Sequence, residues 1–149
     1  DLSLNLHSFI NNHIIPKRWQ NKKRPIVINN WEGTGFDFTR EKILDMAAAG
    51  KKAGAELFVL DDGWFGSRND DKSSLGDWTD NASKTGGIAR LADDIRATGL
   101  DFGIWMEPEM ISPDSNLFRA HPDYAMAIPN KKPFLHRRQK KIQVSKGIR

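Results

Sequence analysis

Two adjacent carboxylates, Asp61 and Asp62, stand where an apolar run ends, in the stretch ELFVLDDGWFG (56–66). Carboxyl pairs hydrolyse glycosides when they face each other about 5 Å apart across the scissile bond, or farther apart in inverting enzymes. Neighbouring residues on an extended strand point to opposite sides, so this pair is poorly placed for that task. Three uses stay open: one carboxylate turned to a ligand, both accepting hydrogen bonds from a polyol, or an Asx turn or helix cap.

Tryptophans accompany these carboxylates. Four of the five fall at expected strand ends or in a long loop rather than in helices: Trp31, Trp64, Trp78 and Trp105. An indole ring most often serves packing, and this alternative holds for each of them. Sugars, however, present apolar C–H faces that stack on indoles while their hydroxyls bond to carboxylates. The combination therefore predicts a carbohydrate site.

The remaining polar residues narrow the chemistry. Glu107 and Glu109 flank Pro108 and could serve as a base, or as ion-pair partners of Arg119 or of a tail cation. The four histidines show no metal-ligand spacing, and the chain has no cysteine and no Gly-x-Ser-x-Gly elbow. We therefore expect no metal site, no disulfide and no serine-hydrolase chemistry.

Hydrophobic periodicity predicts the elements that position these residues. The first two elements are a helix at Leu4–Ile15, stopped by Pro16, and a strand at Ile26–Asn30. A helix follows at Arg40–Lys52; Thr39 caps it, and its inward residues are Ile43, Leu44, Ala47 and Ala48. The last three elements are a strand at LFVL, a helix through Ile88, Leu91, Ala92 and Ile95 that Gly99 ends, and a strand in DFGIWMEPE. This alternation predicts parallel strands, in a doubly wound sheet or a (β/α) barrel. No glycine-rich phosphate fingerprint follows a strand, which favours the barrel. Because a barrel needs roughly 250 residues, we expect only part of one.

Charge is divided unevenly along the 149 residues. The formal net charge is +4, but the eight Lys and Arg from Lys131 onward have no acidic neighbours, so residues 1–130 carry −4. We expect the tail to be solvated; an RNA-binding arm is the alternative, although aromatics are missing after Phe134. No apolar run approaches the roughly 18 residues of a membrane helix. No signal-peptide pattern is present, which together with the missing cysteines favours the cytoplasm.

Four stretches together resemble one family. RPIVINNWEGTGFDFT, ELFVLDDGWFGSRNDDKSSLGDW, GGIARLADDI and FGIWMEPEMISPDSNLFRAHPDY are similar to the catalytic barrel of α-galactosidases of glycoside hydrolase family 36. The resemblance implies an α/β fold: a truncated (β/α)8 TIM barrel with its first three βα units. It divides the chain into a helix and linker (1–24), the N-terminal part of the barrel (25–139) and a divergent basic tail (140–149).

The resemblance also implies a reaction and a site. Such enzymes hydrolyse terminal α-galactosides such as melibiose and raffinose, with retention and without metal or cofactor, and the parent enzyme is expected to be a homo-oligomer. Asp61 and Asp62 match paired aspartates that bind the galactose 4-OH and 6-OH. Trp105 matches a pocket tryptophan, and Trp31 a residue at the pocket rim. Arg137, in HRRQ, aligns with the arginine of an xRNQ motif that helps to bind substrate.

The chain departs from the family pattern near its end. The nucleophile lies in a motif like KWDMN on a later strand, the acid/base is a further aspartate, and neither motif occurs in these 149 residues. Arg138 replaces the motif's Asn, and KKIQVSKGIR replaces an apolar strand such as LVLDLS, which a charged run cannot imitate in a buried parallel sheet. We expect a shifted reading frame, a mis-called exon or a truncated gene. A non-catalytic galactoside-binding module and an inactive truncated gene product stay open as alternatives.

Overall fold

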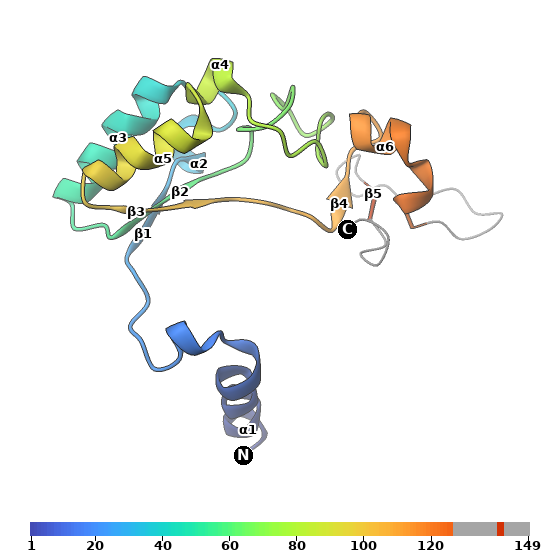
Figure 1. Cartoon of the computed structure of the whole chain (residues 1–149). Helices are drawn as coiled ribbons and strands as arrows, with labels where there is room; N and C mark the ends of the chain where they lie inside the picture. The colour runs from blue at the N-terminus through green and yellow to red at the C-terminus, as the bar shows by residue number, and fades with distance from the viewer. Residues whose placement is uncertain (127–139, 142–149) are drawn as a thin grey trace.

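A three-stranded parallel sheet lies at the centre of the computed structural model, which describes residues 1–126 and 140–141 (Figure 1). The strands β1 (Val27–Asn29), β2 (Leu57–Leu60) and β3 (Asp101–Ile104) follow one another across the sheet. Phe58 pairs with Ile28 on one side and with Phe102 on the other. The predicted parallel order is confirmed, although β1 is one residue shorter at each end and β3 stops before the expected MEPE segment.

Two helices, α3 (Arg40–Lys52) and α5 (Ile88–Ala97), lie side by side over one face of the sheet (Figure 1). Side chains alternate along β2, so Phe58 and Leu60 point into the core and are fully buried, whereas Leu57 and Val59 on the other face are half-buried. The helices contribute their apolar stripes to the same core. These stripes contain Ile43 and Ala47 from α3, and Leu91, Ala92 and Ile95 from α5.

Both helices begin where polar side chains accept hydrogen bonds from their first N–H groups. Thr39 Oγ1 accepts from the N–H of Lys42, as the sequence predicted, and Asp80 Oδ2 accepts from the N–H of Ile88. One inward position was predicted wrongly, because Ala48 is exposed. Gly50 is buried instead. Its backbone packs so closely on β1 that an added Cβ would lie only 2.9 Å from Ile28 Cδ1.

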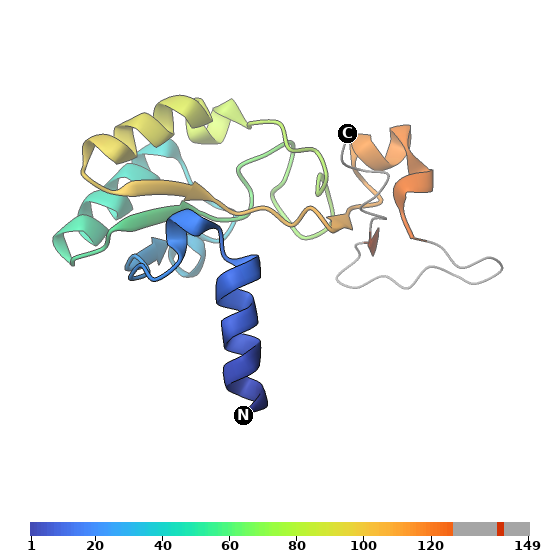
Figure 2. The same ribbon diagram turned by 60° about the horizontal axis from the view of Figure 1, so that its bottom comes forward.

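The N-terminal arm leads into the sheet from outside the core. It consists of α1 (Leu2–Phe9), a π-helical turn (Ile10–Ile14) and a 3-10 turn (Lys17–Trp19). The predicted helix is therefore present but begins and ends earlier, and a π turn forms its last part. Figure 2 shows α1 projecting away from the sheet, and Leu2 is 88% exposed. No helix among the described residues is long and apolar enough to cross a membrane.

Short elements follow the three strands. They are α2 (Trp31–Thr34) after β1, α4 (Ala82–Thr85) before α5, and β4 (Met110–Ile111), α6 (Asn116–Ala120) and a 3-10 turn (Pro122–Tyr124) after β3. Asp77 accepts hydrogen bonds from the first N–H groups of α6, so the long loop after β2 is joined to the segment after β3. In the tail, β5 (Lys140–Lys141) pairs antiparallel with β4.

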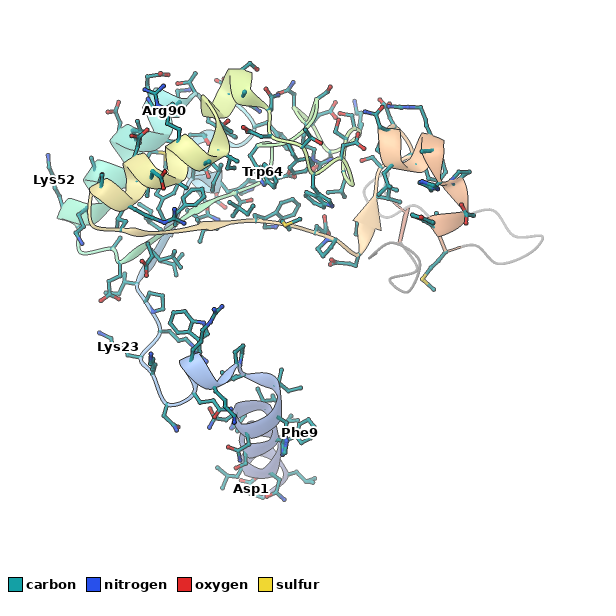
Figure 3. All side chains as sticks on the ribbon, viewed as in Figure 1. Asp1, Phe9, Lys23, Lys52, Trp64 and Arg90 are labelled. Atoms are coloured by element: carbon teal, nitrogen blue, oxygen red, sulfur yellow. The ribbon has the colours of Figure 1, made fainter. Side chains whose placement is uncertain are left out.

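The core can be tested on α5. Ile95→Ala should lower the free energy of unfolding by about 2–4 kcal/mol, because the truncation leaves a cavity in place of a fully buried side chain. Arg90→Ala on the outer side of the same helix (Figure 3) is the control, with an expected change within about 0.5 kcal/mol. Urea denaturation followed by circular dichroism measures both. Equal losses for the two variants would contradict the packing described.

Candidate functional site

A small pocket opens at the C-terminal edge of the sheet, with a volume of about 160 Å³. Trp31 follows β1, Asp61 follows β2 and Trp105 follows β3, and parallel strands bring these ends together. The lining residues are Trp31, Asp61, Asp62, Arg68, Asp71, Trp105 and Glu107. Four of the five residues predicted for the site therefore lie in one pocket. The fifth, Arg137, lies outside the described residues.

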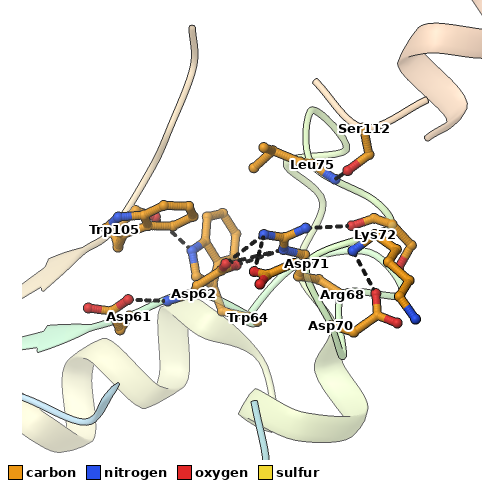
Figure 4. A network of polar contacts seen from close by, with 12 residues as sticks. Asp61, Asp62, Trp64, Arg68, Asp70, Asp71, Lys72, Leu75, Trp105 and Ser112 are labelled. Carbon is orange, nitrogen blue, oxygen red and sulfur yellow. Dashed lines mark hydrogen bonds and ion pairs between the residues drawn. The ribbon is translucent and has the colours of Figure 1, made fainter. Parts of the chain in front are cut away.

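The most tightly held group in this pocket is an ion pair between Asp62 and Arg68 (Figure 4). The Nε of Arg68 donates to both carboxylate oxygens, at 3.0 Å and 3.2 Å, and its Nη2 donates to Oδ2 at 2.8 Å. Asp62 is 6% exposed and Arg68 only 1%. Paired charges of this kind withstand burial, whereas a single one would be strongly destabilising.

The chain between these two residues turns back on itself. Gly63 and Gly66 have φ angles of +99° and +51°, which side chains with a Cβ rarely adopt. Arg68 is then held by further contacts: its Nη1 donates to the carbonyl of Ser73 at 3.0 Å, and its guanidinium lies 5.5 Å from the ring centroid of Phe36. The guanidinium thus joins the end of β2 to the loop after it and to the segment after β1.

Asp61 has different partners from those of Asp62. Its Oδ2 accepts from the side-chain amide of Asn29, and its Oδ1 accepts from the N–H of Asp62 at 2.8 Å. The Asp61 N–H donates to Oδ1 of Asn30, a fully buried residue. The two carboxylates thus serve different networks. The contact to the next N–H also differs from an Asx turn, in which the side chain bonds two residues onward.

The tryptophans divide between packing and the pocket. Trp64 is 4% exposed, and its indole N–H donates to the carbonyl of Trp105 at 2.9 Å. Trp105 is half-buried and lines the pocket, and its ring stacks near Phe65 in the core. Trp31 is also half-buried, and its backbone N–H donates to Oδ1 of Asn29. Packing is therefore the role of Trp64, which supports Trp105 at the edge of the pocket.

Lys84 fastens the turn that carries Arg68. Its ammonium group donates to the carbonyls of Gly63 and Arg68 at 3.0 Å and 3.3 Å, and to Oδ1 of Asn69 at 3.1 Å. Burial lowers the pKa of Lys84 below its usual value, while the negative charges of Asp62 and Asp37 act in the opposite direction.

Three lining residues were absent from the sites predicted from the sequence. Arg68 and Asp71 lie in the loop segment SRNDDK, where one arginine among acidic residues was the available signal. Glu107, whose role was left open between base and ion-pair partner, lines the pocket. Arg119 pairs with Asp114 at 2.7 Å.

A second cavity lies at the opposite end of the strands. It measures about 570 Å³, and its lining includes Trp19 of the arm, Pro25 just before β1, and Leu57 and Phe102 of the sheet. Its lining is mainly apolar and lacks the convergent carboxylates of the smaller pocket, which is therefore the better candidate for polar chemistry. Across residues 1–126 and 140–141, no three His, Asp or Glu side chains gather in a way that could hold a metal ion.

Comparison with known proteins decides the family. The family model for melibiases matches residues 1–147. The chain belongs to the melibiase family. It is 47% identical over 146 residues to a bifunctional alpha-galactosidase/sucrose kinase of Mediterraneibacter gnavus, and 45% identical over 146 residues to an alpha-galactosidase of Lactobacillus acidophilus. These alignments cover 97% of the chain but only 16% and 20% of the relatives.

Solved structures agree with this assignment. A variant of the glycoside hydrolase family 36 alpha-galactosidase AgaA from Geobacillus stearothermophilus, in complex with 1-deoxygalactonojirimycin, gives a TM-score of 0.87 at 44% identity. The match covers 97% of this melibiase-family chain and 20% of that structure. The galactosidase domain of the Mediterraneibacter gnavus relative gives a TM-score of 0.86 at 47% identity, covering 97% and 20%. The chain thus corresponds to a small part of these enzymes, an α/β unit with a parallel sheet.

The contribution of the Lys84 hydrogen bonds to stability can be tested by mutation. Lys84→Met should destabilise the fold by about 1–3 kcal/mol, because two backbone carbonyls lose their donor. Lys72→Met, an exposed change in the loop after β2, should stay within about 0.5 kcal/mol. Thermal unfolding of both variants measures the difference. A Lys84 variant as stable as wild type would show that these hydrogen bonds do not hold the turn.

Proposed function

We propose that this chain is part of a retaining α-galactosidase and forms the galactose-binding wall of its active site. The observation that carries the proposal is the meeting of Asp61, Asp62, Trp31 and Trp105 in one pocket at the C-terminal edge of the sheet. Relatives with alpha-galactosidase names support the substrate class, and structures of the Geobacillus stearothermophilus enzyme in complex with raffinose and with stachyose support oligosaccharides of that type.

The polar groups of the pocket suit a sugar. A carboxylate has about four acceptor positions, and Asp61 uses one on each oxygen for Asn29 and for the N–H of Asp62. Acceptor capacity is therefore left for sugar hydroxyls, while the half-buried rings of Trp31 and Trp105 offer apolar surface for C–H groups. The pocket volume of about 160 Å³ is below the ~300 Å³ typical of small-molecule sites, which suits one wall of a larger site.

We infer that the sheet forms the first three βα units of a (β/α)8 barrel. In the described part of the chain α3 and α5 cover one face, and Leu57 and Val59 present apolar surface on the other, where a barrel has its interior. Within the described residues, β1 and β3 each pair with β2 alone, which leaves both edges available to further strands. In this proposal residues 1–24 lead into the barrel, 25–139 belong to it, and 140–149 form the divergent tail.

The reaction of the whole enzyme would be a double displacement, with attack of a carboxylate on the anomeric carbon followed by attack of water. Asp61 and Asp62 are engaged with Asn29 and Arg68, and their roles in this proposal are to bind hydroxyls. The resemblance assigns the nucleophile and the acid/base to motifs on later strands. We therefore propose that residues 1–149 bind galactosides and leave the chemistry to groups outside this segment.

Titration calorimetry of the purified chain with galactose tests the binding role. We expect saturable binding, with glucose, which differs only at C4, bound about tenfold more weakly, because a hydroxyl read by a carboxylate contributes roughly 1.5–3 kcal/mol. Asp61→Ala should weaken galactose binding by a similar factor. Equal affinity for both sugars, or no heat with either, would refute the proposal.

A turnover assay separates binding from catalysis. The chain alone should release no p-nitrophenol from p-nitrophenyl α-galactoside above the rate of a protein-free blank, because two properly spaced carboxyl groups are needed for hydrolysis. Release above the blank that is abolished by Asp61→Ala would show that this segment itself is catalytic.

A further inference from the structure

Arg68 is the largest fully buried side chain in the described part of the chain, and neither the sequence patterns nor the family resemblance assigned it a role. Its charge is fully desolvated at 1% exposure, which is tolerated only where good partners surround it. Its main charged partner is Asp62, one of the proposed galactose ligands. We propose that Arg68 is a positioning residue, which fixes the Asp62 carboxylate in the orientation that one galactose hydroxyl requires; this inference rests on the proposed function.

The contact geometry restrains Asp62 strongly. Nε of Arg68 contacts both carboxylate oxygens, and Nη2 adds a third contact of 2.8 Å to Oδ2. A planar guanidinium fork with two donor nitrogens fixes both the position and the rotation of a carboxylate. A single ammonium group could supply the charge but not the rotational restraint. The lone pairs of Asp62 that remain free are therefore held in one direction.

Arg68 acts through Asp62 rather than on the ligand. Its Nη1 donates to the carbonyl of Ser73 at 3.0 Å, so each guanidinium nitrogen donates within the protein, and at 1% exposure the group has almost no surface to offer a ligand. Asp62 lines the pocket as well, and its carboxylate retains acceptor capacity. A sugar hydroxyl would therefore donate to the Asp62 carboxylate, and Arg68 would set the direction of that hydrogen bond.

Asp71 is the second carboxylate near the guanidinium. It lines the same pocket and lies 3.7 Å from Nη2 of Arg68, but its side chain is 58% exposed, against 9% for Asp62. Exposed ion pairs are weak because water screens them. Asp71 therefore contributes little to holding the guanidinium, and Asp62 is its main charged partner.

The experiment compares galactose with 4-deoxygalactose and 6-deoxygalactose. If Asp61 and Asp62 each read one of these hydroxyls, wild type should prefer galactose over each analogue by about tenfold. Arg68→Met should reduce the preference over one analogue to about twofold or less and leave the other near its wild-type value. Arg68→Lys should keep roughly half of the lost preference on a logarithmic scale, because it restores charge without the fork. Asp70→Asn, an exposed change in the same loop at a residue outside the pocket lining, should keep both preferences.

These ratios distinguish positioning from stability. A merely structural role would reduce the folded fraction, which circular dichroism measures separately, but would leave the preferences of folded molecules unchanged. Unchanged preferences in Arg68→Met, or in Arg68→Lys where the Met variant does not fold, would overturn the inference while wild-type binding keeps the proposed function. Equal loss of both preferences would also overturn it. If wild type binds no sugar, the proposed function fails and the inference falls with it.

Discussion

The carboxylate of Asp62 and the guanidinium of Arg68 are both buried, and each would be strongly destabilising without the other. The chain must therefore return to the end of β2 within six residues, through two glycines with positive φ angles. Lys84 then fastens this turn from a separate helix, α4. The pocket wall thus depends on the Asp62–Arg68 ion pair and on the turn that makes it possible.

The sheet supplies the second condition for the site. Because its three strands are parallel and in register, the sheet itself brings Trp31, Asp61 and Trp105, which follow the strand ends, to one edge. Core packing on the helical face keeps that edge in place, since Phe58 and Leu60 point into the core that α3 and α5 cover. The proposed recognition groups come from the strand ends, and the long loop after β2 adds the cation that holds one of them.

Local patterns predicted the elements and the strand-end residues well, because periodicity, the Thr39 cap and strand length depend on nearby residues. They missed Arg68, because its partner is set by a turn whose path depends on tertiary contacts with Ser73, Lys84 and Phe36. They also could not separate Trp64 from Trp105. Both follow strands, but a hydrogen bond across the sheet assigns one ring to the core and the other to the pocket.

The central claim is that galactose binds at the C-terminal edge of the sheet. The most direct measurement is a galactose titration of the 15N-labelled chain, followed through the indole N–H signals in NMR spectra. The signals of Trp31 and Trp105 should shift saturably with one common dissociation constant, whereas that of Trp19, which lines the other cavity, should stay in place. A shift of Trp19 with Trp31 and Trp105 unmoved would contradict the claim.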